Sequence, residues 1–85
     1  MLQETEKYYV DKQSGYIFVR NTRRHVIAIK PEAILGFAEA YVRFKNGTPQ
    51  NIDPSTHTVV HLKTGVVVCM LSIVEFNQAL REIKS

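Results

Sequence analysis

The fold is decided by residues 57–84, whose sequence is HTVVHLKTGVVVCMLSIVEFNQALREIK. Two valine-rich runs, at 57–62 and 66–71, predict strands because β-branched side chains favour extended backbone. The three residues between them end in Gly65, which supplies the positive φ that a short hairpin loop usually needs. This segment therefore predicts an antiparallel β-hairpin.

A capped helix is predicted directly after this hairpin. Ser72 and Glu75 stand three residues apart, the spacing of a capping box, in which each side chain bonds the backbone N–H of the other residue. Four apolar side chains then recur at helical spacing: Ile73, Phe76, Leu80 and Ile83. A helix with one apolar face must bury that face, so we expect it to pack on the sheet.

Three further strands are predicted in the N-terminal third of the chain. Residues 7–11 and 16–20 are rich in aromatic and β-branched side chains and flank a turn that contains Gly15, which indicates a second hairpin. A third strand is predicted at 25–30, after a polar corner. With the C-terminal hairpin this makes about five strands, so the sequence predicts an α+β fold with a small antiparallel sheet and a C-terminal amphipathic helix packed on it.

Residues 31–44 fit two structures. As a helix, the segment has Pro31 at its first position and Gly47 just past its end. As a strand, its side chains alternate between two faces, and Gly36 opposes the helix by about 1 kcal/mol. The local pattern favours the helix. Residues 45–56 contain two prolines, which predicts a long loop in place of a paired strand.

The composition indicates a single globular domain over residues 1–85, with residues 1–6 frayed, since 85 residues leave no room for a second domain. So small a core leaves stability marginal, and dimerisation is an ordinary way to add buried area. The acidic N-terminus is unlike a signal peptide, and no apolar run approaches the ~20 residues of a membrane span. One cysteine fits a reducing compartment, so a cytoplasmic protein without membrane contact is expected.

Candidate catalytic and metal-binding residues are few. His57 and His61 are four residues apart, which on a strand separates them by about 13 Å, too far to bind one ion. Cys69 lies in an apolar run, where a buried and inert thiol is expected. The sequence has no nucleophile elbow and no glycine-rich phosphate loop. We therefore expect no enzyme, no metal site and no cofactor.

The basic charge is concentrated in one stretch of chain. The net charge is +3, but residues 12–45 carry seven Lys or Arg against two Glu. Four cations around the corner before His25 are candidates for contact with nucleic acid or another anion: Arg20, Arg23, Arg24 and Lys30. Four nearby aromatic residues are candidates for stacking on bases: Tyr8, Tyr9, Tyr16 and Phe18.

Two hypotheses about function follow. The first is a non-enzymatic protein-interaction or regulatory module that binds a protein partner or a second copy of itself. The second is a nucleic-acid-binding protein that uses the basic turn around residues 20–25.

Two runs of sequence also carry a family resemblance. They are VIAIKPEAI at 26–34 and TVVHLKTG at 58–65, and a further strand and the Ser72–Glu75 helix start follow the second run. Together they resemble the FlbD-like family of small bacterial proteins and, more remotely, are similar to the sheet of LytTR-type DNA-binding domains. The resemblance implies strand at 35–44, against the local preference, and a regulatory or motility setting with no established enzymatic activity.

Overall fold

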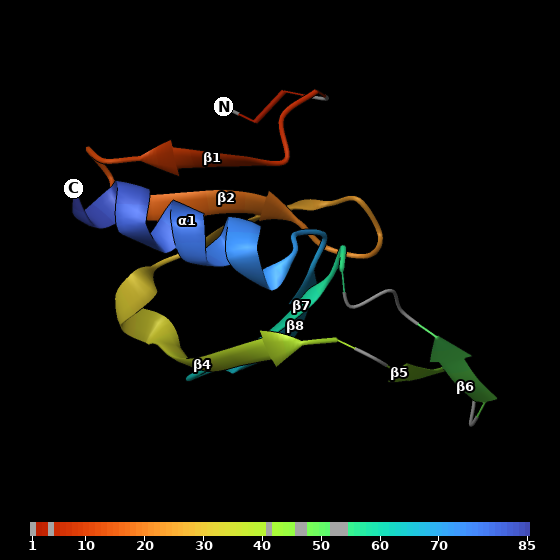
Figure 1. Ribbon diagram of the computed structural model, residues 1–85. Coiled ribbons are helices and arrows are strands. Elements are labelled where there is room, and N and C mark those ends of the chain that lie inside the picture. Colours follow the sequence, from red (N-terminus) through yellow and green to blue (C-terminus); the bar gives the residue numbers. More distant parts are fainter. Residues whose placement is uncertain (1, 4, 41, 46–47, 52–54) are drawn as a thin grey trace.

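The computed structural model describes residues 2–3, 5–40, 42–45, 48–51 and 55–85, and only the backbone of 42–45 and 48–51. These residues form two three-stranded antiparallel sheets, a two-stranded sheet, a short 3-10 helix and one α-helix (Figure 1). In chain order the elements are β1 (Tyr8–Asp11), β2 (Tyr16–Arg20), β3 (Val26–Ile29), η1 (Pro31–Ala33), β4 (Ile34–Glu39), β5 (Val42–Lys45), β6 (Thr48–Asn51), β7 (Thr58–Leu62), β8 (Gly65–Cys69) and α1 (Ile73–Lys84).

The first sheet is an antiparallel meander in the order β1-β2-β3. Its first turn closes because the backbone N–H of Gly15 donates to the carbonyl of Asp11 at 2.8 Å. Gly15 has a φ of 79°, a left-handed conformation that glycine adopts without strain. The Asp11 carboxylate also accepts from the backbone N–H of Gln13 at 3.1 Å, which fixes the turn. The three strands predicted in the N-terminal third are confirmed.

The second sheet has the order β4-β7-β8 and contains the hairpin predicted from the valine-rich runs at 57–62 and 66–71. Leu62 pairs with Gly65, so Lys63 and Thr64 form a two-residue loop between β7 and β8. The hairpin and the helix after it are confirmed, with β8 beginning one residue earlier than predicted. The α+β class is confirmed as well. The described residues hold eight strands in place of about five.

The prediction of a helix over residues 31–44 is wrong. Pro31–Ala33 form a single turn of 3-10 helix, after which the chain continues as β4. β4 pairs with β7 along its length, and Phe37 contacts Phe76 of α1 edge-on, with 4.9 Å between the ring centroids. Tertiary packing therefore outweighs a local helical pattern that Gly36 already weakened. Strand is also what the FlbD-like resemblance implied for this stretch.

The prediction of a long loop at residues 45–56 is wrong for Thr48–Asn51, which form strand β6. β5 and β6 form an antiparallel ladder in which Phe44 lies opposite Pro49. From the sequence, Pro49 predicts that this stretch does not pair. A two-stranded ladder, however, leaves one edge of each strand unpaired, and a proline nitrogen is tolerated on that edge. Residues 46–47 and 52–54, with the Pro54 of the same argument, lie outside the described residues.

The β5–β6 pair, called the arm below, projects from the body of the protein beyond the end of β4 (Figure 1). The backbone N–H of Ala40 donates to the carbonyl of His57 at 3.3 Å, at the end of the β4–β7 ladder. Residues 40–41 connect β4 to β5, whereas residues 52–57 connect β6 to β7. β5 and β6 pair only with each other among the described strands, so the arm is a separate ladder with its own register.

The two three-stranded sheets meet at a backbone bridge and enclose the helix between them. Asn21 and Cys69 form an antiparallel bridge, and the backbone N–H of Met70 donates to the carbonyl of Arg20 at 2.9 Å. α1 lies between the sheets in Figure 1 and closes the core from one side. The buried core consists of Ile17, Val19, Ile29, Val60, Cys69, Leu71, Phe76 and Ala79.

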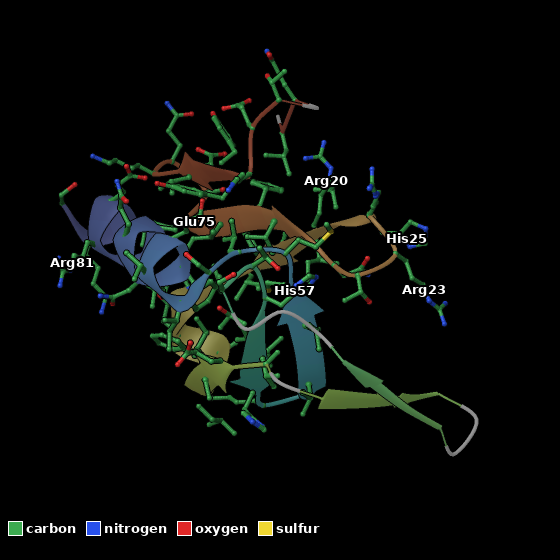
Figure 2. All side chains as sticks on the ribbon, turned by 45° about the vertical axis from the view of Figure 1, so that its right-hand side comes forward. Arg20, Arg23, His25, His57, Glu75 and Arg81 are labelled. Atoms are coloured by element: carbon green, nitrogen blue, oxygen red, sulfur yellow. The ribbon has the colours of Figure 1, made fainter. Side chains whose placement is uncertain are left out.

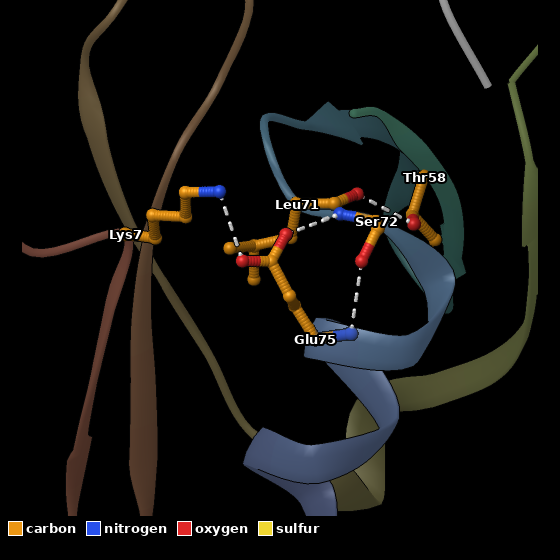
Figure 3. Close-up of polar contacts among 5 residues, drawn as sticks. All are labelled: Lys7, Thr58, Leu71, Ser72 and Glu75. Atoms are coloured by element: carbon orange, nitrogen blue, oxygen red, sulfur yellow. Dashed lines mark hydrogen bonds and ion pairs between the residues drawn. The ribbon is translucent and has the colours of Figure 1, made fainter. Parts of the chain in front are cut away.

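The start of α1 is tied to both sheets by polar contacts (Figure 3). Ser72 Oγ accepts from the backbone N–H of Glu75 at 3.1 Å, and Glu75 Oε1 accepts from the backbone N–H of Ser72 at 3.0 Å. The same carboxylate lies 3.1 Å from Lys7 Nζ, just before β1. The buried hydroxyl of Thr58 donates to the Leu71 carbonyl at 2.8 Å. The predicted capping box is confirmed, and it is continuous with contacts to β1 and β7.

Described residues of the N-terminal segment, among them Gln3 and Glu6, form hydrogen bonds with β2. The Arg20 guanidinium donates to the carbonyl of Glu6 at 2.9 Å and to that of Gln3 at 3.1 Å. The side chain of Leu2 is only 8% exposed. Arg20 therefore acts as a clamp on this segment, because one planar guanidinium can donate to two carbonyls at once.

Replacing Ser72 by alanine should lower the free energy of unfolding by about 1 kcal/mol, because the backbone N–H of Glu75 loses its capping acceptor. Urea denaturation followed by circular dichroism measures the change. The matched control is Gln78→Ala, an exposed position on the same helix, where a change within about 0.5 kcal/mol is expected. Equal losses at both positions would contradict the capping role.

Glu75 should also make stability depend on pH. Partial burial alone would raise the pKa of Glu75, but hydrogen bonds from the Ser72 backbone and from Lys7 outweigh it and lower the pKa. The carboxylate therefore stabilises the fold above its unfolded pKa of about 4.3, and this stabilisation is lost as the pH falls through the lowered value. Melting temperatures recorded between about pH 6 and about pH 3 should fall less steeply for Lys7→Gln than for the wild-type protein. Parallel curves would show that the ion pair contributes nothing.

Candidate functional site

The predicted basic turn is a tight corner between β2 and β3, organised by one asparagine. Asn21 Oδ1 accepts from the backbone N–H of Arg23 at 2.9 Å and of His25 at 3.0 Å. The backbone N–H of Arg24 donates to the Asn21 carbonyl at 2.9 Å, and Arg24 has a φ of 64°, which is uncommon for a residue with a side chain. The corner presents Arg23, Arg24 and His25 as exposed side chains.

The other two predicted cations lie outside this corner. Arg20 turns toward the N-terminal segment that it clamps, whereas Arg23 and His25 project from the corner (Figure 2). Lys30 follows the far end of β3, with its Nζ 5.3 Å from the centroid of the Tyr16 ring. The length of β3 separates Lys30 from the corner by about 13 Å. The structure therefore does not gather the four cations into one basic cluster.

Strand alternation nevertheless places Arg20 and Lys30 on one face of the first sheet. On β2 the fully buried residues are Ile17 and Val19, so the residues between and beside them point away from the core. The strand pairing carries this alternation to β1 and β3. We call this the outer face, and its residues are Tyr9, Asp11, Tyr16, Phe18, Arg20, Val26, Ala28 and Lys30.

Three aromatic rings form a cluster on the outer face. The centroid of the Phe18 ring is 6.0 Å from that of Tyr9 and 6.4 Å from that of Tyr16. Tyr16 is 36% exposed and Val26 is 47% exposed. An antiparallel sheet usually turns polar side chains to water on its uncovered face. Most of this face instead consists of aromatic and apolar groups, with a cation at each end and Asp11 beside Tyr16, which makes it a candidate binding surface.

The sequence predicted these three rings as candidates for stacking on bases, together with a fourth ring, that of Tyr8. Tyr8 points to the opposite face, where it packs against the core and its hydroxyl bonds Glu82 of α1. Burial and this hydrogen bond raise the pKa of Tyr8. Because successive residues of a strand point to opposite faces, Tyr8 and Tyr9 cannot share one surface. The signal that separates them was present in the sequence.

A second exposed feature is the outer edge of β8, the last strand of the second sheet, which is bridged to Asn21 at its Cys69 end. β8 contains three valines and no charged residue or proline, and it pairs with β7 without a shift in register. Val66, near its start, is 60% exposed. Its last residue, Cys69, bridges Asn21, so the basic corner lies at one end of this edge.

The residues considered for metal or acid–base chemistry lie apart from one another. His57 precedes β7, where its Nδ1 lies 2.8 Å from Thr56 Oγ1, and His61 is exposed on β7 opposite Val66. Within the described ranges, no three residues among His, Cys, Asp and Glu lie close enough to hold a metal ion. The remaining candidate functional surfaces are the outer face, the basic corner and the β8 edge.

Comparisons of the chain with protein families, with curated proteins and with solved structures found no match. The resemblance to FlbD-like and LytTR-type proteins therefore stays a prediction. In the part of the chain that the structure describes, no helix is long and apolar enough to cross a bilayer.

Cys69 should be unreactive in the folded protein. It is fully buried, as the sequence predicted, and burial raises the pKa of its thiol to about 12. The reactive thiolate is therefore scarce at neutral pH and shielded from solvent. A chromogenic disulfide reagent should label Cys69 only after urea unfolds the chain, and rapid labelling under native conditions would contradict the placement of this residue.

Proposed function

We propose that this chain is a non-enzymatic protein-interaction module that binds its partner by strand addition at β8. The part of the β8 edge that lies before the Asn21–Cys69 bridge carries the proposal. Unpaired N–H and C=O groups at a sheet edge attract another strand, so proteins usually protect an edge with a charge, a proline or a bulge. β8 has none of these.

Of the other outer strands of the two sheets, β4 and β1 carry such protection. β4 shifts register between Ile34 and Gly36 and ends at Glu39. β1 ends at Asp11, whereas β3, like β8, contains no charged residue or proline and is followed by Lys30. β8 differs from β3 in the strongly exposed Val66, at 60% against 47% for Val26.

The backbone groups available on this edge follow from the bridge to β2. Met70 directs its N–H away from β7 to the Arg20 carbonyl. Alternate residues of a strand direct their backbone groups to the same side, so Val66 also directs its backbone groups outward, on the part of the edge before the Asn21–Cys69 bridge. A partner strand would gain affinity from these main-chain groups and specificity from the exposed Val66 side chain.

The homodimer is the case in which the added strand is β8 of a second copy. Antiparallel pairing about Val66 would bring Lys63 of one copy toward Arg23 and Arg24 of the other. These like charges repel, so self-association through β8 should be weak and should strengthen with added salt. A partner of another kind is free of this repulsion.

Sedimentation analysis over a wide concentration range, at low and high salt, tests self-association. Val66→Lys places a charge on the edge and should abolish any dimer. The matched control is Val74→Lys, on α1, since Val74 is 72% exposed and lies away from the edge. A dimer unaffected by Val66→Lys would contradict the β8 interface, and a monomer under all conditions would remove the homodimer.

A soluble peptide of alternating threonine and valine tests strand addition without a second copy. Titration followed by amide chemical shifts should move the signal of Val66 before those of other strands. Absence of both dimer and peptide binding at β8 would overturn the proposal.

We also propose a regulatory role in the cytoplasm. The single cysteine, which can form no disulfide within the chain, supports the location. The FlbD-like resemblance supports the regulatory role.

Nucleic-acid binding is the second candidate function. Arg23 and Arg24 are exposed at one corner, and the described residues offer neither of them an ion-pair partner. Arginines in this state can neutralise phosphates, and the affinity that results falls steeply with salt.

A further inference from the structure

The outer face combines the two kinds of group that bind a single nucleic-acid strand. Its aromatic cluster supplies flat apolar surfaces, because the Phe18 ring lies between those of Tyr9 and Tyr16 at 6.0 and 6.4 Å. Aromatic side chains on a β-sheet can stack two or three unpaired bases, and every base offers a face for this contact.

Cations lie at both ends of this aromatic cluster. Lys30 Nζ is 5.3 Å from the Tyr16 centroid at one end. At the other end Arg20 follows Phe18 on the same face of β2, and the basic corner with Arg23 and Arg24 lies beyond it. From Tyr16 to Arg20 the strand spans about 13 Å. Phosphates on either side of a few stacked bases would therefore meet positive charge.

The acidic residue of the outer face, Asp11, lies on its β1 side. Asp11 pairs with Tyr16 across the strands, and its carboxylate accepts from the backbone N–H groups of Gln13 and Ser14 at 3.1 and 3.5 Å. The β3 side of the face ends at Lys30 and has no carboxylate among its own residues. The path for a phosphate backbone therefore runs along β2 and β3, away from β1.

We propose that the outer face binds single-stranded nucleic acid, with bases stacked on Tyr9, Phe18 and Tyr16 and phosphates near Lys30 and the basic corner. The inference rests on nucleic-acid binding, the second candidate function, and uses a surface separate from the β8 edge. A duplex is the poorer ligand, since its bases are already stacked on one another.

Fluorescence anisotropy at low salt tests the proposal with the full chain and a labelled oligothymidylate of about 12 nucleotides, a duplex of equal length, and heparin as a polyanion without bases. The single strand should bind more tightly than the duplex, with affinity that falls as salt rises. Tyrosine emission gives a second readout on the unmodified protein, because the chain has no tryptophan and base stacking quenches tyrosine.

The central variant is Tyr16→Thr with Phe18→Val, which removes two rings and keeps residues that favour strands. It should weaken binding of the single strand about tenfold or more while leaving heparin binding unchanged. The matched control is Val74→Thr on α1. Lys30→Gln should weaken both ligands, whereas Lys63→Gln, on the other sheet, should weaken neither.

Several results would overturn the inference. Parallel loss of heparin and single-strand binding in the aromatic variant would show charge alone, and equal affinity for the duplex would remove base stacking. If only Arg23→Gln with Arg24→Asn abolishes binding, the corner binds nucleic acid and the outer face does not. Asn is chosen at position 24 because it tolerates the left-handed backbone there. Absence of binding at low salt, with tyrosine emission unchanged, would contradict both nucleic-acid binding and its location.

Discussion

The backbone bridge between Asn21 and Cys69 is the constraint on which the rest of the architecture depends. Each three-stranded sheet is built from neighbouring or nearly neighbouring strands, and neither could bury its inner face alone. The bridge and the Met70–Arg20 hydrogen bond fix the angle between the sheets. Since α1 begins shortly after β8, this junction also directs the helix into the space between the sheets, where Phe76 becomes fully buried.

Elements specified by short-range chemistry were the ones that the sequence predicted well. The β7–β8 hairpin and the Ser72–Glu75 cap depend on residues within a few positions of each other. β4 is different, because its strand state depends on pairing with β7, in which Ile34 meets Leu62. A pattern read over residues 31–44 alone contains no information about that partner. The same holds for β6, where the two-stranded setting makes Pro49 acceptable.

The candidate site shows a similar division between local and distant information. The corner at Asn21 was predictable, because a short polar side chain at a turn bonds its own following backbone. The prediction that Arg20 and Lys30 form one cluster with this corner is wrong. Residues that are close in sequence lie far apart in space when a strand separates them. Their shared face follows from strand alternation, but whether α1 covers that face or leaves it open is decided by packing with the second sheet.

The arm has a consequence for how this chain can change over generations. Among the residues whose side chains the structure describes, the buried core is formed by residues outside the arm. The described backbone of the arm pairs within itself. The Asn21–Cys69 bridge and the capping box of α1 lie outside the arm, so exchanging residues at its tip should leave both in place. The arm is thus a natural graft point, at which the same scaffold can acquire a new recognition sequence without refolding the rest.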